Sequence, residues 1–349
     1  MHDVHITGLG GYLPAVMHTN DTLPPLDAPL ADGEDVRIGV RRRGWASEAA
    51  GESIPEMAAA AARQALARAG IAPGELDLVL LANWTQRRFI PEHAPRLQAL
   101  LGAGRAFAFD LCTACAGFVY GVAVAHAFLQ NPRFSRALVV ASETTSRRGR
   151  PGSKSTLIFG DGAGAAVVER GAAGGARVLD YELATDGAHH GAMEIDEHGW
   201  VRTHLPQKEL NALAARSFAE PAARLLARAG RTMDDVDWVV PHSGTAGIQA
   251  TLIRALAVPA EKVLSNFATI GNVSSAAIPL ALDEFVAAGR IRPGDTVLSP
   301  TTGTGWYAAA LLLEMGEMRV AGDAPARPPA AAQGAGKRGP ARAAPGEGR

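Results

Sequence analysis

The sequence lacks most features that mark secreted, membrane-spanning or metal-binding proteins. Its 349 residues include only two cysteines, too few for a disulfide framework and consistent with a reducing compartment. No run approaches the roughly 20 apolar residues of a membrane span. The first residues also lack the basic and then apolar segments of a secretory signal. We therefore expect a cytoplasmic protein that does not associate with membranes.

The charge is also unbiased. The formal net charge is −1, which gives no general attraction to nucleic acid or anionic lipid, so neither is an expected partner. Hydrophobic residues make up 47% of the chain and charged residues 20%, as in globular proteins with a large core. The length allows one large domain or two ordinary ones.

Cys112 and Cys115 have the C-x-x-C spacing of redox pairs and of half zinc sites. A zinc site needs two further thiolate or imidazole ligands, and the sequence has no second cysteine pair. Histidines 189, 190, 198 and 204 fit no compact zinc pattern. The apolar flanks of the pair also argue against an exposed redox motif. We expect no metal and no cofactor.

Cys115 lies where an expected buried strand, Phe107–Leu111, turns into an expected helix, Ala116–Leu129. That helix is apolar on nearly every side, so it must be buried. The free N–H groups and the positive dipole end of a helix start lower the pKa of a cysteine thiol. This stretch alone leaves two interpretations open, a nucleophile and an inert buried cysteine.

Strands and helices alternate along the chain, which predicts an α/β protein. The expected helices are Ser53–Ala69, Pro91–Leu101, Ala116–Leu129 and Ser217–Ala229. The expected strands are Val4–Gly8, Leu76–Ala82, Phe107–Leu111, Ala137–Ala141, Val236–Val240, Val263–Ser265, Thr296–Leu298 and Ala308–Leu313. We further expect a glycine turn at Gly8–Gly11, and we expect glycines 160, 162 and 164 to permit a tight turn and close backbone packing beside an apolar strand.

A short repeat predicts two related halves. Ala67-Arg-Ala-Gly70 recurs as Ala227-Arg-Ala-Gly230, and Asp77 recurs as Asp237, with the same offset of 160 positions. We expect an N-terminal half over residues 1–170 and a C-terminal half over 171–320. Residues 321–349 are rich in Ala, Pro, Gly and Arg and are expected to form a disordered tail.

His242 and Asn272 each follow an expected buried strand, as Cys115 does. The carboxyl ends of such strands meet at one edge of a sheet, so the three side chains are expected to lie together. A thiolate can attack an activated acyl group, while His and Asn side chains donate hydrogen bonds to an oxygen that becomes negative.

With these residues in place, the sequence resembles the β-ketoacyl-acyl carrier protein synthase III family of the thiolase superfamily, from Val4 to Leu313. The matching motifs are Ala114-Cys-Ala-Gly-Phe118, Phe159-Gly-Asp-Gly-Ala-Gly164, Val240-Pro-His242 and Gly271-Asn-x-Ser-x-Ala276. The resemblance implies a thiolase-like five-layer αβαβα fold with two pseudo-symmetric halves. It also implies a homodimer.

The resemblance implies that Cys115 carries the acyl group, as the nucleophile of a decarboxylative Claisen condensation. His242 and Asn272 would bind the thioester carbonyl of a malonyl-type extender, and the backbone N–H groups of Cys115 and Gly305 would form the oxyanion hole. Acyl-coenzyme A or acyl carrier protein thioesters would be the substrates. Two alternatives remain: an acyltransferase on the same fold that uses an oxygen or nitrogen nucleophile, and a non-catalytic partner subunit, which typically loses the cysteine.

Departures from the family concern the substrate. Arg37-Ile-Gly-Val40 is present, but Gly33-Glu-Asp35 stands where the family places an adenine-stacking tryptophan. Ser243-Gly-Thr245 replaces the usual Gln-Ala-Asn after the catalytic histidine. The four arginines of Arg37–Arg43 form either a solvated loop or a patch for an anionic cofactor arm, and Arg37 and Ile90 are candidate substrate-binding residues. These departures predict a role in a specialised fatty acid or polyketide pathway.

Overall fold

The computed structural model describes residues 2–320 and is built from alternating strands and helices. The helices are α1 (Glu34–Ile38), α2 (Ile54–Ala69), α3 (His93–Leu101), α4 (Gly117–Leu129), α5 (Ser155–Ile158), α6 (Gln207–Arg228), α7 (Ala246–Leu256), α8 (Phe267–Ile270) and α9 (Ala277–Ala287). The strands are β1 (Val4–Tyr12), β2 (Met17–Thr19), β3 (Arg42–Gly44), β4 (Leu78–Ala82), β5 (Phe107–Leu111), β6 (Arg136–Thr144), β7 (Asp161–Arg170), β8 (Ala176–Thr185), β9 (Met193–Ile195), β10 (Val201–Thr203), β11 (Trp238–Val239), β12 (Thr296–Gly303) and β13 (Tyr307–Glu314).

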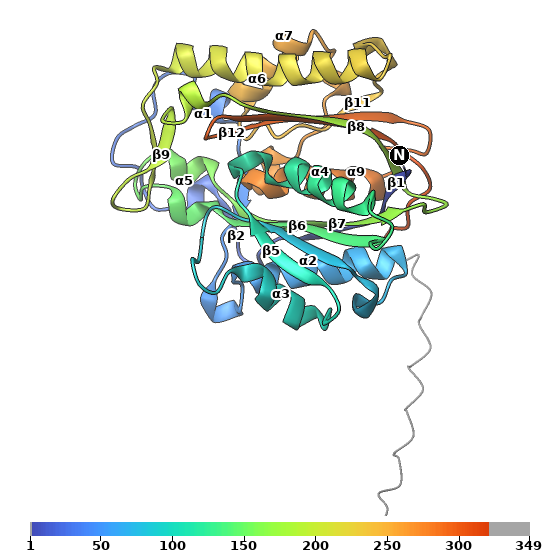
Figure 1. Cartoon of the computed structure of the whole chain (residues 1–349). Coiled ribbons are helices and arrows are strands. Elements are labelled where there is room, and N and C mark those ends of the chain that lie inside the picture. Colours follow the sequence, from blue (N-terminus) through green and yellow to red (C-terminus); the bar gives the residue numbers. More distant parts are fainter. Residues whose placement is uncertain (1, 321–349) are drawn as a thin grey trace, which may run out of the picture.

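These elements stack in five layers (Figure 1). Helices α6 and α7 cover one face of the sheet that contains β8, β11 and β12, and α2 and α3 cover the far face of the sheet that contains β6 and β7. Helices α4 and α9 fill the space between the two sheets. This is the αβαβα arrangement that the family resemblance implied.

The two sheets are continuous, with the strand order β11-β12-β13-β8-β1-β7-β6-β4-β5. Strands β1 and β8 connect the two halves of this sheet through two residue pairs, His5 with Arg177 and Ile6 with Ala176. At this junction the nine-stranded sheet bends back on itself and encloses α4 and α9 (Figure 1). The all-apolar sequence of α4 follows from this position, since both its sides face a sheet and Val119 and Val122 are fully buried.

Strand β1 runs to Tyr12, so the glycine turn expected at Gly8–Gly11 is wrong. These glycines serve close packing instead. A Cβ atom at Gly8 would lie 2.1 Å from the Ala65 carbonyl oxygen, and one at Gly10 would lie 2.3 Å from that of Ala61. The absent side chains let helix α2 lie directly on the strand.

Gly162 and Gly164 lie inside β7, so the tight turn expected there is wrong, whereas the close packing expected of these glycines is confirmed. A Cβ atom at Gly164 would be 2.7 Å from the Pro279 ring, so this glycine permits close packing of the central helix α9. Helix α6 begins at Gln207, ten residues before the expected start at Ser217, and it contains Pro221.

The expected boundary between halves falls between β7, which ends at Arg170, and β8, which begins at Ala176. The division into two halves stays a prediction. The tail expected over 321–349 lies outside the described residues. Across residues 2–320, no helix is both long and apolar enough to cross a membrane.

Candidate active site

Cys115 lies in a single 3-10 turn, Ala114–Ala116, between strand β5 and helix α4. Ala114 has a φ of 46°, a left-handed conformation that is uncommon for a residue with a side chain. The chain therefore reverses sharply just before the cysteine and begins the buried helix just after it. A β-carbon at Gly303 would lie 2.9 Å from the Cys115 nitrogen, so the turn leaves no room for a side chain there.

Burial dominates the acidity of this cysteine. It raises the pKa of the Cys115 thiol to about 12, aided by the nearby Glu143 carboxylate and opposed by a hydrogen bond from Ser274. The sequence-based expectation was a thiolate stabilised by the helix start. In the folded protein the side chain is a thiol at neutral pH, and the anion forms only as it reacts.

His242 follows strand β11, and its backbone N–H donates to the Pro300 carbonyl at 3.2 Å. The side chain is buried, which lowers its pKa to about 4, and its Nδ1 has no hydrogen-bond partner. The imidazole is therefore neutral at physiological pH. A neutral ring offers one N–H donor and one acceptor nitrogen to a substrate.

Asn272 lies between α8 and α9, and the Phe159–Gly164 motif anchors its backbone. The Asn272 N–H donates to the Ile158 carbonyl at 2.7 Å, and its carbonyl accepts from the Gly160 N–H at 3.1 Å and the Thr145 hydroxyl at 2.8 Å. Its side-chain Oδ1 accepts from the Ser274 N–H at 2.9 Å. That bond fixes the amide orientation and leaves Nδ2 as the donor group.

Gly244 shows how closely His242 and Asn272 approach one another. A Cβ atom at Gly244 would lie 2.6 Å from the Asn272 Nδ2 and 3.6 Å from the His242 Cε1. Gly244 also has a φ of 68°, in the left-handed region that favours glycine. The Ser243-Gly-Thr245 departure therefore places a glycine where both geometry and space require one.

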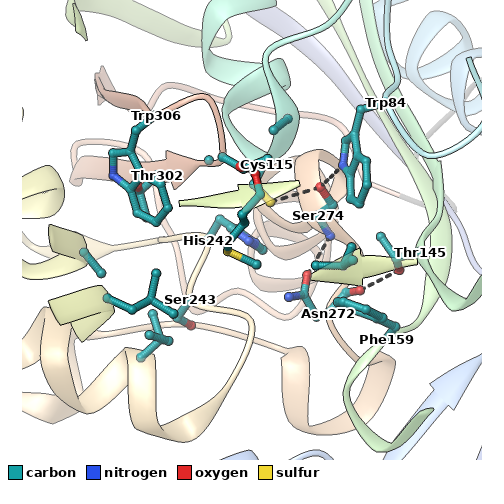
Figure 2. Close-up of a pocket in the computed structure, with 18 of the residues that line it drawn as sticks. Trp84, Cys115, Thr145, Phe159, His242, Ser243, Asn272, Ser274, Thr302 and Trp306 are labelled. Atoms are coloured by element: carbon teal, nitrogen blue, oxygen red, sulfur yellow. Dashed lines mark hydrogen bonds between the residues drawn. The ribbon is translucent and has the colours of Figure 1, made fainter. Parts of the chain in front are cut away.

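Cys115, His242 and Asn272 line one cavity of about 230 Å³. Figure 2 shows the cysteine sulfur, the imidazole and the amide facing the same space. The rest of the wall is largely apolar. Its other lining residues are Trp84, Ala114, Thr145, Phe159, Met193, Glu194, Ile195, Val201, Leu210, Ala214, Ser243, Ile248, Ser274, Thr302, Gly303, Thr304 and Trp306. The sequence thus predicted the meeting of these three side chains, while their roles in chemistry stay predictions.

The end of β12 contributes Thr302 and Gly303 to the cavity wall, and the loop before β13 contributes Thr304 and Trp306, whereas Gly305 is not part of the lining. Gly303 abuts the Cys115 backbone, as described above. Gly303 is therefore a better candidate than Gly305 for the second oxyanion-hole donor.

The two candidate substrate-binding residues lie outside this cavity. Arg37 belongs to α1, and its guanidinium donates to the Asp32 carbonyl at 3.3 Å. Ile90 is 92% exposed on the surface of the single chain. Arg43 is fully buried and donates to the Leu157 carbonyl at 2.6 Å, so the arginines of 37–43 do not form one uniform solvated loop or anion patch.

Trp84, Ser274 and Glu143 belong to the site, although sequence reasoning assigned them no role. Ser274 was visible as the serine of Gly271-Asn-x-Ser-x-Ala276, but no spacing rule indicated what it contacts. Cys112 does not line the cavity. Among the described residues, no group of three His, Cys, Asp or Glu side chains is placed to hold a metal ion.

Two family models match this chain: 3-oxoacyl-[acyl-carrier-protein (ACP)] synthase III over residues 109–187, and 3-oxoacyl-[acyl-carrier-protein (ACP)] synthase III C terminal over residues 226–315. A β-ketoacyl-[acyl-carrier-protein] synthase III of a Nostoc species is 34% identical over 329 residues, which cover 90% of this chain and 98% of the relative.

Solved structures show the same likeness. The crystal structure of 3-oxoacyl-[acyl-carrier-protein] synthase III from Aquifex aeolicus has a TM-score of 0.82 and 34% identity, covering 89% of this chain and 99% of that one. The priming β-ketosynthase of a polyketide biosynthetic pathway has a TM-score of 0.80 and 31% identity, covering 90% and 97%.

Proposed function

The chain belongs to the 3-oxoacyl-[acyl-carrier-protein] synthase III family, and from this premise we propose that it catalyses a decarboxylative Claisen condensation on a specialised pathway. The acyl group would be carried on Cys115 and the extender would be a malonyl-type thioester. The observation that carries the proposal is the shared cavity, in which a nucleophile and two hydrogen-bond donors face one space.

In the first half-reaction, the Cys115 sulfur attacks the carbonyl carbon of the acyl thioester. A C–S bond to Cys115 forms, the bond to the donor breaks, and the donor leaves as a thiol. The cysteine proton must move because the resting side chain is a thiol. The neutral imidazole of His242 is a proton acceptor within the same cavity.

In the second half-reaction, the His242 N–H and the Asn272 Nδ2 donate to the thioester carbonyl oxygen of the extender. Loss of carbon dioxide leaves an enolate on that oxygen, which the two donors stabilise. The enolate carbon attacks the acyl carbonyl on Cys115, and the backbone N–H groups of Cys115 and Gly303 support the resulting oxyanion. Collapse breaks the C–S bond to Cys115 and releases the β-ketoacyl product, and the sulfur anion takes up one proton from solvent to return to the thiol.

The N-terminal segment has Gly33-Glu-Asp35 where the family resemblance expects the tryptophan that stacks on the adenine of coenzyme A. Glu34 and Asp35 occupy the first turn of α1, where the family resemblance expects an aromatic ring, and Glu34 pairs with Lys154 at 2.6 Å. This acidic turn supports an acyl carrier protein, or an unusual acyl thioester, as the donor. Efficient turnover of acetyl-coenzyme A with the carrier protein of ordinary fatty acid synthesis would contradict the specialised role.

The direct test is intact-protein mass spectrometry after incubation with a panel of acyl thioesters. We expect a mass increment that identifies the primer and that disappears in the Cys115→Ala variant. Release of carbon dioxide from a malonyl thioester, with a β-keto product, supports condensation. Acyl transfer to an alcohol or amine without carbon dioxide release would support the alternative acyltransferase, and an unreactive Cys115 would support a partner subunit.

We also propose that the protein is a homodimer that pairs through strand β5. This strand lies at the edge of the nine-stranded sheet, and its apolar side chains are only partly covered within one chain. Phe89 and Ile90 are exposed large hydrophobic residues, at 89% and 92%. A second copy would cover an open strand edge that otherwise invites association.

A further inference from the structure

The Ser274 hydroxyl lies against the reacting atom of the proposed mechanism. Its Oγ is 3.2 Å from the Cys115 Sγ, and the Trp84 indole Nε1 is 2.7 Å from the same oxygen (Figure 2). An indole N–H is only a donor. The Ser274 oxygen therefore accepts from Trp84, which leaves its own hydrogen free to point at the sulfur.

The buried side chain of Glu143 accepts hydrogen bonds from both segments, the one that contains Trp84 and the one that contains Ser274. Glu143 accepts from the Trp84 backbone N–H at 3.3 Å and from the Thr85 hydroxyl at 2.7 Å, which fixes the segment after β4. Its other oxygen accepts from the Ser275 hydroxyl at 2.5 Å, which fixes the turn that contains Ser274. Trp84 and Ser274 are 190 positions apart in the sequence, and Glu143 ties their two segments together.

The Ser274 backbone contacts Asn272, a second residue of the proposed mechanism. Its N–H donates to the Asn272 Oδ1 at 2.9 Å, as described above. Its φ is 52°, a left-handed conformation that a residue with a side chain adopts only where its surroundings hold it. One strained residue thus contacts the nucleophile with its side chain and the proposed extender-binding amide with its backbone.

A sulfur anion needs such a donor in this cavity. Burial raises the pKa of the Cys115 thiol, the Glu143 carboxylate raises it further, and the hydrogen bond from Ser274 acts in the opposite direction. Hydrogen bonds to charged groups are stronger than those to neutral groups. The interaction therefore strengthens as the thiol ionises.

We propose that Ser274 is a further catalytic residue, whose hydroxyl stabilises the Cys115 sulfur anion during acylation, and that Trp84 is the positioning residue that aims this hydroxyl. The proposal rests on Cys115 as the acylated nucleophile of the proposed function. Condensation itself is not needed to test it, because the chemistry of the sulfur can be measured with a simple alkylating agent.

The experiment follows the rate at which iodoacetamide alkylates Cys115 from pH 8 to pH 10, above the pKa of about 7 of the buried Glu143 carboxyl and below that of the Cys115 thiol. All proteins carry Cys112→Ser, so that Cys115 is the only thiol. In this range the rate is proportional to the thiolate fraction, and in Ser274→Ala we expect it to fall about four- to tenfold at every pH. In Trp84→Phe, which keeps a ring but removes the N–H, we expect a smaller fall of about two- to fivefold.

The matched control is Ser299→Ala. Ser299 is fully buried in β12, its hydroxyl has no partner, and it does not line the cavity, so its alkylation profile should match the parent protein. A Ser274→Ala profile equal to the parent would overturn the proposal. If Ser274→Ala does not fold, Trp84→Phe decides: a parent-like profile there also overturns it.

A second measurement separates catalysis from structure. Ser274→Ala keeps the backbone N–H that orients Asn272, so decarboxylation of a malonyl thioester should fall less than twofold. Equal losses of alkylation and decarboxylation would indicate a structural role and contradict the proposal. A protein that no acyl thioester modifies, but whose alkylation depends on Ser274, would refute the proposed function and the role of Ser274 in acylation, and would leave only the stabilisation of the Cys115 sulfur anion by Ser274.

Discussion

The buried imidazole of His242 sets the pH range in which the proposed extender step can run. Burial lowers its pKa from 6.5 to about 4, so the ring stays neutral well below the usual titration range of histidine. We expect the acid limb of malonyl thioester decarboxylation to have a midpoint near pH 4. A pH–rate profile between pH 3.5 and 8 measures this, and a midpoint near 6.5 would contradict it.

The same lowered pKa predicts how stability depends on pH. The unfolded chain binds a proton at His242 below about pH 6.5, whereas the folded chain does so only below about pH 4. The contribution of the neutral His242 ring to the free energy of unfolding is therefore fully present above pH 6.5 and is lost as the pH falls toward 4. Relative to His242→Gln, the parent should lose about 3 kcal/mol between pH 7 and pH 4, measured by denaturant unfolding.

Gly244 should be indispensable for the Asn272 amide. Gly244→Ala would place a methyl group 2.6 Å from the Asn272 Nδ2 and force the amide away. We expect malonyl thioester decarboxylation to fall at least about tenfold, the effect of losing one well-placed donor. Alkylation of Cys115 should change little, because the sulfur does not depend on that donor.

The control for Gly244→Ala is Gly230→Ala. Gly230 has a similar φ of 64°, but a Cβ atom there meets nothing within 4 Å. Both variants carry the same backbone strain, about 1 kcal/mol, and only one carries the clash. Similar decarboxylation rates in the two variants would show that the Asn272 amide keeps its position despite the added methyl group, and would contradict the prediction.

Individual residues could be predicted from the sequence where a local pattern marks them. Cys115, His242 and Asn272 each follow an expected strand, and the structure brings them to one cavity. The Trp84–Ser274 bond could not be predicted, because it joins segments that only tertiary packing brings together. Gly303 and Gly305 are two residues apart, Gly303 at the end of β12 and Gly305 in the loop after it, and only the packing against Cys115 distinguishes them.

At the scale of elements, the glycines of β1 determine how closely α2 can pack. A β-carbon at Gly10 would lie 2.3 Å from the Ala61 carbonyl and 2.6 Å from the Ala65 nitrogen, both backbone atoms that cannot move alone. We expect Gly10→Ala to lower the free energy of unfolding by about 2–3 kcal/mol, as in overpacked cores. Denaturant unfolding monitored by circular dichroism measures the change.

Gly74→Ala is the matched substitution in open space, since a Cβ atom at Gly74 would meet nothing within 4 Å and its φ is not in the left-handed region. Its effect should stay within about 0.5 kcal/mol. An equally small effect of Gly10→Ala would mean that β1 and α2 can move apart without lowering the free energy of unfolding, and would contradict the prediction.

Elements with a single strong signal were predicted well. Strand β5 matches its expected range, and α2 ends at Ala69 with Gly70 as its cap, as expected. The turns expected in the glycine-rich segments are wrong, although the close packing expected of glycines 160, 162 and 164 is confirmed, because the sequence records the absent side chain but not which neighbour requires it. At Gly8 and Gly164 the reason is a neighbouring helix distant in the sequence, so local turn rules failed.

At the scale of the whole molecule, the proposed homodimer can be tested at strand β5. The Phe107 N–H donates to the Asp77 carbonyl, toward β4. N–H groups alternate sides along a strand, so that of Ala108 faces the open edge. Ala108→Pro should remove this outward donor, leave the β4 pairing intact and shift the protein toward monomer in light scattering after size-exclusion chromatography.

Ala108→Gly keeps the N–H group and should remain dimeric at the same concentration. A monomeric parent protein would refute the dimer outright, and an Ala108→Pro protein that stays dimeric would place the interface elsewhere.

Two residue pairs between β1 and β8 join the two halves of the sheet, and residues from both halves line the cavity. The cavity is therefore completed late during synthesis on the ribosome. The thiol at 115 emerges long before the imidazole at 242 and the amide at 272, and the wall from Thr302 to Trp306 comes later still. A nascent chain therefore carries an incomplete reaction chamber until its last strands have left the exit tunnel. Under the proposed function, an unfinished chain therefore lacks the groups that would let it consume thioesters.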